Sequence, residues 1–234
     1  MNTALILAGG IDPRFNMNIP KQFVNVNNRP IIVYTLEIFQ KHPDIDEIIV
    51  SCLDGWQEMV RVYGKQFNID KLSGIITGGK DAQESTYHGL DYLKDKSGRG
   101  DIVIIHDAIR PMVSEEIISK SIQMCRRRGN GIAATYIMDS IMYSDDGIKG
   151  DESIDRNKIM KVQTPQSFDF ESIWNLHQKA ITQKSLGAWD NSTLLSNLGE
   201  TVYFSEGSDL NIKINTPEDV EMFKALYKMK HPDE

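Results

Sequence analysis

The sequence predicts an α/β fold: a mostly parallel β-sheet with helices on both faces, and a β-hairpin arm that protrudes from it. Short runs of β-branched residues alternate with longer amphipathic segments through residue 137, which is typical of parallel strands covered by helices. Glycine turns follow two of the apolar runs, and the alternation breaks after Asp139. With 234 residues, of which 40% are hydrophobic, the chain fits one domain spanning residues 1–234.

The first part of the chain reads as strands and helices in turn. We expect strands where β-branched residues cluster, and helices where apolar residues recur every three or four positions. The expected strands are 4–7, 47–51, 73–77, 102–105 and 131–137, and the expected helices are 31–41, 56–67, 85–94 and 115–128. Because ligands of open α/β sheets bind at the carboxyl ends of the strands, the site is expected at that edge.

A hairpin is predicted where the alternation breaks. Two short apolar segments, 140–143 and 158–162, flank a turn signal at 145–147 and indicate an antiparallel pair. We treat residues 139–163 as an arm. Since an isolated hairpin is marginal in water, the arm should pack on the parent sheet or on a second subunit, which predicts a homodimer.

The C-terminal part is expected to resume the alternation. It predicts helices near 171–183 and 191–198, a strand at 201–204, and a short strand carrying Lys213. The last helix opens at Thr216, an N-cap followed by proline and two acids in the first turn. Residues 228–234 are expected to form a frayed tail.

Composition restricts the class of protein. The formal net charge of −7 argues against nonspecific binding to nucleic acid or anionic membranes, because both need a broad basic surface. The apolar runs are too short to span a bilayer, and we expect a soluble, cytoplasmic protein. The two cysteines and five histidines lack the spacing of zinc ligands or of a disulfide framework.

The segment 4–10, an apolar run ending in Gly9 and Gly10, indicates a nucleotide site when it is combined with Arg14 and Lys21 just beyond it. Glycines leave backbone N–H groups free to approach a phosphate, and the two cations would pair with its charge. A glycine turn used for geometry alone is the alternative, which the flanking cations disfavour. Neither the P-loop motif nor the dinucleotide fingerprint is present, so a kinase or dehydrogenase is not indicated.

Asp107 follows the buried run 102–105, where a carboxylate suits Mg²⁺. The alternative is an ion pair with Arg110 that only closes a loop. A second glycine turn at Gly79 precedes a helix, and Lys213 is either a ligand of the site or simply solvated. Together, glycine turns, cations and one strand-end acid are the parts needed for phosphoryl or nucleotidyl transfer, in which positioning and electrostatics dominate.

These segments resemble the cytidylyltransferases that join CTP to a polyol phosphate, either 2-C-methyl-D-erythritol 4-phosphate or ribitol 5-phosphate. The resemblance implies a Rossmann-like fold of the nucleotide-diphospho-sugar transferase type. It spans nearly the whole chain and is carried by the following segments: 7–10, Arg14, 20–23, 78–79, Ser85, 89–90, 106–111, 139–140, 155–157, 163–168, 211–213 and 216–219.

The resemblance also implies roles for individual residues. Arg14 and Lys21 would hold the triphosphate and stabilise the transition state, Asp107 would bind Mg²⁺, and Arg156 and Lys213 would position the phosphate of the polyol phosphate. The cytidine moiety would lie against two glycine turns, contributed by Leu7, Ala8, Gly9, Gly10, Gly79, Lys80, Asp81 and Ser85. The remaining implied substrate contacts are Arg110, Ser140 and Asp190.

The implied reaction is an in-line attack of a phosphate oxygen on the α-phosphorus of CTP, which releases pyrophosphate and forms a CDP-polyol. The partners are thus CTP and a small polyol phosphate. In the family the arm reaches across a dimer, so that Ser140 and Arg156 would serve the partner's site. Within the family, the residues at 8–10 and 163–168 slightly favour the members that act on ribitol 5-phosphate.

The chain departs from the family pattern at several positions. Asp12 replaces a glycine beside Pro13 in the first loop, Ala82 replaces an arginine in the second, and Trp189 replaces a small hydroxyl residue. Lys80 is a candidate for the missing positive charge. Two further functions stay open: a nucleotidyltransferase for another base or polyol phosphate, and a nucleotide-binding dimer that has lost turnover.

Overall fold

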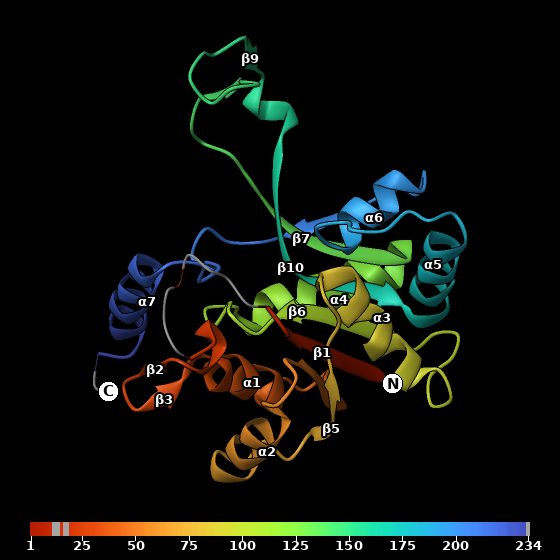
Figure 1. The fold of residues 1–234 in the computed structure, drawn as a ribbon, viewed down its shortest axis with the longest axis vertical. Helices are drawn as coiled ribbons and strands as arrows, with labels where there is room; N and C mark the ends of the chain where they lie inside the picture. The colour runs from red at the N-terminus through yellow and green to blue at the C-terminus, as the bar shows by residue number, and fades with distance from the viewer. Residues whose placement is uncertain (11–14, 16–18, 233–234) are drawn as a thin grey trace.

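The computed structural model describes residues 1–10, 15 and 19–232. In this part of the chain a seven-stranded sheet forms the centre, in the order β11-β7-β10-β6-β1-β4-β5, with helices on both of its faces (Figure 1). The strands are β1 (Asn2–Ala8), β2 (Asn25–Val26), β3 (Arg29–Pro30), β4 (Glu47–Cys52), β5 (Leu72–Thr77), β6 (Ile102–Asp107), β7 (Asn130–Tyr136), β8 (Ile141–Tyr143), β9 (Glu152–Ile154), β10 (Met160–Asp169) and β11 (Phe204–Glu206).

The helices follow the predicted order. They are α1 (Ile31–Lys41), α2 (Gln57–Gln66), α3 (Ala82–Leu93), α4 (Glu115–Arg128), α5 (Phe170–Thr182), α6 (Asn191–Asn197) and α7 (Pro217–Lys230), with short 3₁₀ turns at Lys21–Phe23 and Arg156–Lys158. The predicted bounds of α1 and α4 are confirmed, since the apolar period and the flanking signals agree there. None of the described helices is long and apolar enough to cross a membrane.

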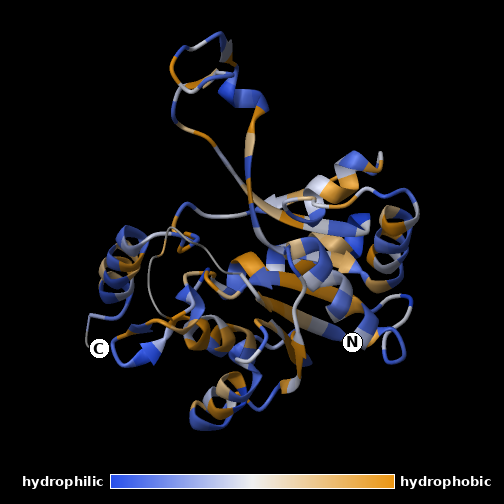
Figure 2. Ribbon diagram, in the orientation of Figure 1, coloured by the Kyte–Doolittle hydropathy of each residue, from blue (hydrophilic) through white to orange (hydrophobic). Residues whose placement is uncertain are grey.

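The sheet separates two apolar layers. One layer packs α1, α2 and α4 against one face of the sheet, and includes the fully buried Ile6, Leu36 and Ile118. The other packs α3, α5 and α6 against the opposite face, around Leu5 and Val103. In Figure 2 the hydrophobic colour is concentrated on the central strands. Along β1, Ile6 belongs to one apolar layer and Leu5 to the other, so the strand needs helices on both faces of the sheet.

The sheet is parallel near the site. Strand β1 lies between β4 and β6 and is parallel to both, and Leu7 is in register with Asp107. The carboxyl ends of β1 and β6 therefore meet at one edge of the sheet. The prediction of a mostly parallel sheet with helices on both faces is confirmed, although β10 runs antiparallel between β6 and β7.

The hairpin prediction was partly wrong. Residues 158–162 do not pair with 140–143; instead Met160 is in register with Tyr136 and Val162 with Ala134, so that β10 pairs with β7. At the tip, β8 pairs with β9. The arm thus continues two neighbouring strands of the sheet, and it projects far from the body of the molecule in Figure 1. Where β7 and β10 extend beyond the sheet, pairing with each other satisfies their backbone hydrogen bonds.

Three expectations near the C-terminus also need correction. The strand expected at 201–204 is β11, which begins three residues later at Phe204, and 211–214 forms no strand. The latter segment is held instead by Ile214, which is fully buried and whose N–H donates to Ile109 O at 2.9 Å. Helix α7 extends to Lys230, so the expected tail begins as helix. The predicted start of α7 is confirmed by a capping box between Thr216 and Asp219.

Candidate active site

A cleft of about 360 Å³ lies at the carboxyl ends of β1, β5 and β6. Most of the residues predicted for the site line it, together with four others that were not predicted, Gln22, Leu53, Ala82 and Ile109. The predicted residues found there are Leu7, Ala8, Gly9, Gly10, Lys21, Gly79, Lys80, Asp81, Ser85, Asp107 and Lys213. A larger cavity of about 470 Å³, between α5 and the start of β7, holds none of the predicted residues.

Asp107 lies at the end of β6 and meets two cations. Lys213 Nζ is 3.2 Å from Oδ1 and 3.1 Å from Oδ2, and Arg110 Nε donates to Oδ2 at 2.9 Å. Burial disfavours the charged carboxylate, but the charges of Lys213 and Arg110 outweigh it and hold the pKa of Asp107 well below its usual range. The cleft therefore contains an ionised carboxylate.

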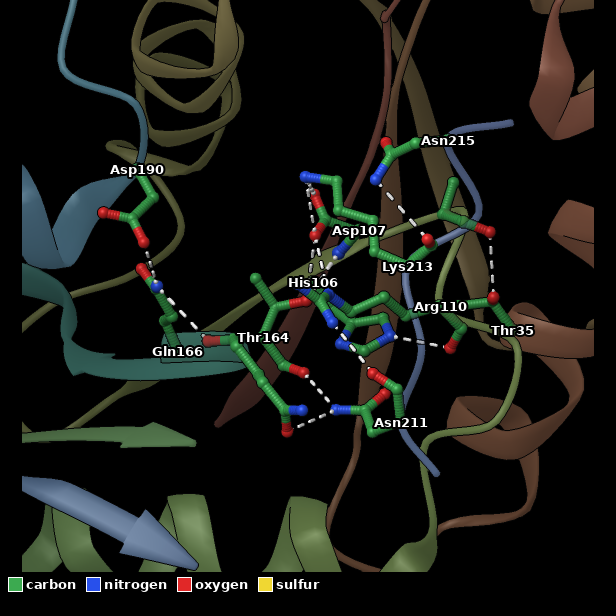
Figure 3. Close-up of polar contacts among 12 residues, drawn as sticks. Thr35, His106, Asp107, Arg110, Thr164, Gln166, Asp190, Asn211, Lys213 and Asn215 are labelled. Carbon is green, nitrogen blue, oxygen red and sulfur yellow. Dashed lines mark hydrogen bonds and ion pairs between the residues drawn. The ribbon is translucent and has the colours of Figure 1, made fainter. Parts of the chain in front are cut away.

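Arg110 makes the ion pair that the sequence left as the alternative interpretation of this loop. Its side chain is buried and does not line the cleft. Besides contacting Asp107, its Nη1 donates to Asn211 O at 2.8 Å (Figure 3). The predicted substrate residue Arg110 is thus committed to two groups of the protein.

Lys21 is nearly fully buried, yet it lines the same cleft. Its Nζ donates to Asn215 Oδ1 at 3.1 Å. The following residue, Gln22, donates from Nε2 to Ala8 O at 2.7 Å, which ties this turn to the end of β1. Arg14, Asp12 and Pro13 lie outside the described residues.

The second glycine turn is closed by its own hydrogen bonds. Gly79 N donates to Ser85 Oγ at 3.0 Å, and Lys80 N donates to Glu84 Oε2 at 2.8 Å. Asp81 caps α3 by accepting from Glu84 N at 2.8 Å. A Cβ at position 79 would lie 2.3 Å from Glu84 Cγ, so glycine is required for this close approach. Asp81 and Ser85 therefore shape the wall of the cleft.

Three predicted residues lie away from the cleft. Ser140 and Arg156 are exposed on the arm, where Arg156 Nη1 donates to Met138 O. Asp190 caps α6 and accepts from Gln166 Nε2 at 2.9 Å. In Figure 3 the pair Asp190 and Gln166 lies to one side of the group around Asp107. Trp189, beside Asp190, is 90% exposed.

Sequence reasoning missed the polar residues that hold the charged ones. Thr164 Oγ1 accepts from Asp107 N at 3.1 Å, and Asn215 contacts Lys21 as described above. Asn211 is fully buried and donates from Nδ2 to Thr164 O at 2.8 Å. Thr164 and Asn211 fall within the motifs that suggested the resemblance, so their position in the chain was the available signal.

His106 precedes Asp107 and is fully buried. Its Nε2 is 3.3 Å from Arg110 O, and burial lowers its pKa to about 3. The imidazole is therefore neutral at physiological pH. The imidazole lies between the ring of Phe39, whose centroid is 5.1 Å away, and the Arg110 backbone. It therefore packs beneath the loop that follows β6 and helps to hold that loop in place.

The side chains in the cleft limit the kind of metal site that this protein can form. Among residues 1–10, 15 and 19–232, no group of three or more histidine, cysteine or acidic side chains is arranged to hold one. Mg²⁺ is commonly bound by one or two carboxylates with phosphate oxygens and water as its other ligands. Asp107 therefore suits a magnesium ion that arrives with a polyphosphate, and does not suit a metal held by the protein alone.

Comparison with known proteins agrees with this geometry. The family model for 2-C-methyl-D-erythritol 4-phosphate cytidylyltransferase (IspD) matches residues 2–228. The chain is 40% identical to a ribitol-5-phosphate cytidylyltransferase of Lacticaseibacillus paracasei over 98% of this chain and 99% of that protein. It is 36% identical to a 2-C-methyl-D-erythritol 4-phosphate cytidylyltransferase of Clostridium botulinum over 94% of each.

Solved structures show the same fold. The 4-diphosphocytidyl-2C-methyl-D-erythritol synthase of Anaerococcus prevotii superposes with a TM-score of 0.82 at 26% identity, covering 97% of this chain and 96% of that one. The 2-C-methyl-D-erythritol 4-phosphate cytidylyltransferase of Thermus thermophilus gives a TM-score of 0.77 at 27% identity, covering 96% and 98%.

Proposed function

This chain belongs to the 2-C-methyl-D-erythritol 4-phosphate cytidylyltransferase (IspD) family, and from that premise we propose that it transfers CMP from CTP to ribitol 5-phosphate with the help of Mg²⁺. The observation that carries the proposal is the convergence of Lys21, Lys213 and Asp107 on one cleft walled by two glycine turns. We favour ribitol 5-phosphate over 2-C-methyl-D-erythritol 4-phosphate. The ribitol-5-phosphate cytidylyltransferase compared above is 40% identical to this chain, whereas the 2-C-methyl-D-erythritol 4-phosphate cytidylyltransferase is 36% identical.

The proposed reaction forms one bond and breaks one. A phosphate oxygen of ribitol 5-phosphate attacks the α-phosphorus of CTP, and the bond between the α-phosphorus and the bridging oxygen to the β-phosphate breaks. The products are CDP-ribitol and pyrophosphate. Since a phosphate monoester is largely ionised at neutral pH, the attacking oxygen needs no general base.

The residues of the cleft would act on charge and position. Lys21 would pair with the triphosphate, and Lys213 would turn from Asp107 to the phosphate of ribitol 5-phosphate. Asp107 would hold Mg²⁺, which, when bound, neutralises charge on the phosphate oxygens. The two glycine turns, 7–10 and 79–85, would lie against the cytidine moiety. Arg14 would join Lys21 at the triphosphate, as its place in the family motif implies.

Pyrophosphate release tests the function directly. CTP is combined with Mg²⁺ and either ribitol 5-phosphate or 2-C-methyl-D-erythritol 4-phosphate, and UTP, ATP and GTP replace CTP in parallel reactions. We expect release with CTP and ribitol 5-phosphate. Release only with the other polyol phosphate would contradict the substrate, and release only with another nucleotide would contradict the base. If CTP with Mg²⁺ raises the melting temperature but no mixture releases pyrophosphate, the alternative function, nucleotide binding without turnover, is favoured.

We also propose that the arm, residues 139–163, joins two subunits into a homodimer. Apolar side chains along it are exposed to solvent: Met142 is 58% exposed and Ile148 is 88% exposed. Such exposure is typical of an interaction surface. In this arrangement Ser140 and Arg156 would contact the substrate in the partner's cleft, which accounts for their distance from the cleft of their own chain.

Hybrid dimers test this arrangement. Lys213→Ala and Arg156→Ala chains are produced separately and together, and each pure variant should be strongly impaired. If Arg156 serves the partner's cleft, the hybrid restores one complete site, and the mixture recovers about a quarter of the wild-type rate. If the mixture stays as inactive as the pure variants, Arg156 does not act across the dimer. Sedimentation of the wild-type protein as a monomer would exclude the dimer itself.

A further inference from the structure

The α5–α6 loop, residues 183–190, is held to the body of the molecule on both sides of Trp189. The backbone N–H of the preceding residue donates to Gln83 Oε1 at 2.9 Å. The carboxylate of the following residue, Asp190, accepts from Gln166 Nε2 at 2.9 Å. The backbone that carries Trp189 is therefore fixed from both directions.

The indole of Trp189 is nevertheless 90% exposed, and Leu186 on the same loop is 59% exposed. Tryptophan is among the side chains that contribute most to protein interfaces when another molecule covers them. Since the α5–α6 loop is already hydrogen-bonded in place, its exposed apolar side chains offer a surface to a second molecule.

The α5–α6 loop borders the cleft. Gln83, which holds the loop, directly follows Ala82, a residue of the cleft wall. Leu186 lines a pocket of about 240 Å³ that shares Lys80 and Asp81 with the cleft. A segment of a partner subunit that enters the cleft would therefore pass close to this loop.

The arm carries exposed side chains that match this surface. It projects from the body of its own chain (Figure 1), and Met142 within it is 58% exposed. Met142 stands two residues after Ser140, which the proposed homodimer sends into the partner's cleft. A strand advances about 3.3 Å per residue, so Met142 would lie about 7 Å from Ser140, near the rim of that cleft. A thioether is also a favourable neighbour for an aromatic ring.

We propose that the α5–α6 loop receives the partner's arm, and that Trp189 packs against the partner's Met142. This inference rests on the homodimer of the proposed function. It adds a receiving surface on the body of each subunit to the arm that reaches across. It also accounts for an exposed tryptophan on a loop whose backbone is fixed.

Dissociation of the dimer tests the contribution of Trp189. Sedimentation over a range of protein concentrations compares Trp189→Ala with Trp189→Phe, which keeps an aromatic ring. Met229→Ala is the control, because Met229 is 64% exposed on α7, at the opposite side of the molecule in Figure 1. Trp189→Ala should raise the dissociation constant about tenfold or more, whereas Trp189→Phe and the control should stay within about threefold of wild type. Equal dissociation constants for Trp189→Ala and wild type would overturn the proposal.

Cross-linking tests the contact itself. Trp189→Cys and Met142→Cys chains with different affinity tags are produced together and treated with a short bismaleimide, and only links between unlike chains are counted. The native Cys52 and Cys125 are buried. We expect a link in this pair and none when Met229→Cys replaces Trp189→Cys. No link in a protein that sediments as a dimer, or an equal link in the control pair, would contradict the contact.

Activity separates this role from a direct contact with substrate. Because the partner's Arg156 completes the proposed site, Trp189→Ala should lose pyrophosphate release on dilution and regain it as the protein concentration rises. A loss that persists where the variant sediments as a dimer would mean that Trp189 acts on the substrate, and the proposal would fail. Thermal melting should show a folded variant, and an unfolded one would overturn the proposal, because a side chain that meets only the partner is not needed to fold one subunit.

The proposed function can fail separately from this inference. Sedimentation of the wild-type protein as a monomer would remove the homodimer and the receiving surface together. A wild-type dimer that cross-links as expected but releases no pyrophosphate would count against the proposed reaction alone.

Discussion

The ammonium of Lys213 lies 3.1 Å from Asp107 Oδ2, although 106 residues separate the two in the chain. Asp107 reaches this point at the end of a central strand, and Lys213 reaches it on an irregular segment anchored by Asn211. The contact places opposite charges on the wall of one cleft. Under the proposed function, an anionic substrate that enters the cleft would compete with Asp107 for the ammonium of Lys213.

Replacing Lys213 should therefore impair turnover more than folding. We expect Lys213→Ala to lower kcat/KM for the polyol phosphate about 100-fold, as for the loss of one preorganised donor to developing charge. Lys224→Ala is the control, since Lys224 is half-buried on α7 and pairs only locally with Glu221 at 2.7 Å. Steady-state pyrophosphate release measures both. A Lys213→Ala enzyme within threefold of the control would remove Lys213 from the mechanism.

Removal of metal should abolish activity reversibly. The single carboxylate of Asp107 suits Mg²⁺ only together with phosphate ligands, so EDTA should stop pyrophosphate release and added Mg²⁺ should restore it. Asp107→Asn should raise the Mg²⁺ concentration needed for half-maximal velocity about tenfold, because the ion loses a charged ligand. Full activity in EDTA would show that the reaction needs no divalent cation.

Lys21 and Asn215 should differ in the size of their effects. Lys21→Ala removes a cation from the cleft and should reduce kcat about 100-fold. Asn215→Ala removes the amide whose oxygen Lys21 contacts at 3.1 Å and whose Nδ2 donates to Lys213 O at 3.4 Å, but leaves both cations in place, and should reduce kcat about 3- to 10-fold. Lys65→Ala, on the exposed surface of α2, serves as the control. An Asn215→Ala effect as large as that of Lys21→Ala would mean that Asn215 itself acts on the substrate.

His106 should make the protein less stable in acid. Burial lowers its pKa to about 3, whereas in the unfolded chain it has an ordinary value of 6.5. Between these values the unfolded state binds more protons, so the free energy of unfolding falls as pH drops from about 6.5 toward about 3. Between pH 7.5 and pH 5, wild type should lose about 2 kcal/mol more than His106→Gln, measured by urea unfolding. Parallel losses in the two proteins would contradict the assignment to His106.

Gly89 should tolerate no side chain at the contact between α3 and β1. A Cβ there would lie 2.4 Å from Leu5 Cδ2, and Leu5 is fully buried. Gly89→Ala should destabilise the protein by about 1–3 kcal/mol through overpacking. At Gly98 a Cβ would meet no atom within 4 Å, so Gly98→Ala should be neutral or slightly stabilising. Denaturant unfolding distinguishes them, and equal stabilities would show that Leu5 repacks without cost.

Local signals in the sequence were sufficient for much of the fold. The bounds of α1 and α4 follow from the apolar period, and the start of α7 from the capping residues Thr216 and Asp219. Most of the cleft was also predictable, because glycine turns and a strand-end carboxylate mark the edge of a parallel sheet. Each of these signals depends on residues a few positions apart.

Strand pairing could not be read in the same way. Residues 158–162 and 140–143 look like two halves of a hairpin, yet Val162 pairs with Ala134 and the tip pairs separately. Nor does the sequence indicate that residues 163–169 enter the sheet antiparallel, between β6 and β7. Apolar alternation indicates that a segment is extended, but the choice of neighbour depends on which edges the rest of the fold leaves open.

By itself the sequence determined most of the helices and central strands and the residue types around the cleft, because propensity, capping and glycine geometry act over one or two turns of chain. Only the tertiary structure decided that Arg110 serves Asp107 and Asn211 within the protein, and that Asn215 meets Lys21. Those contacts join residues that are 101 and 194 positions apart, and they form because Asn211 and Ile214 hold an irregular segment beside the end of β6.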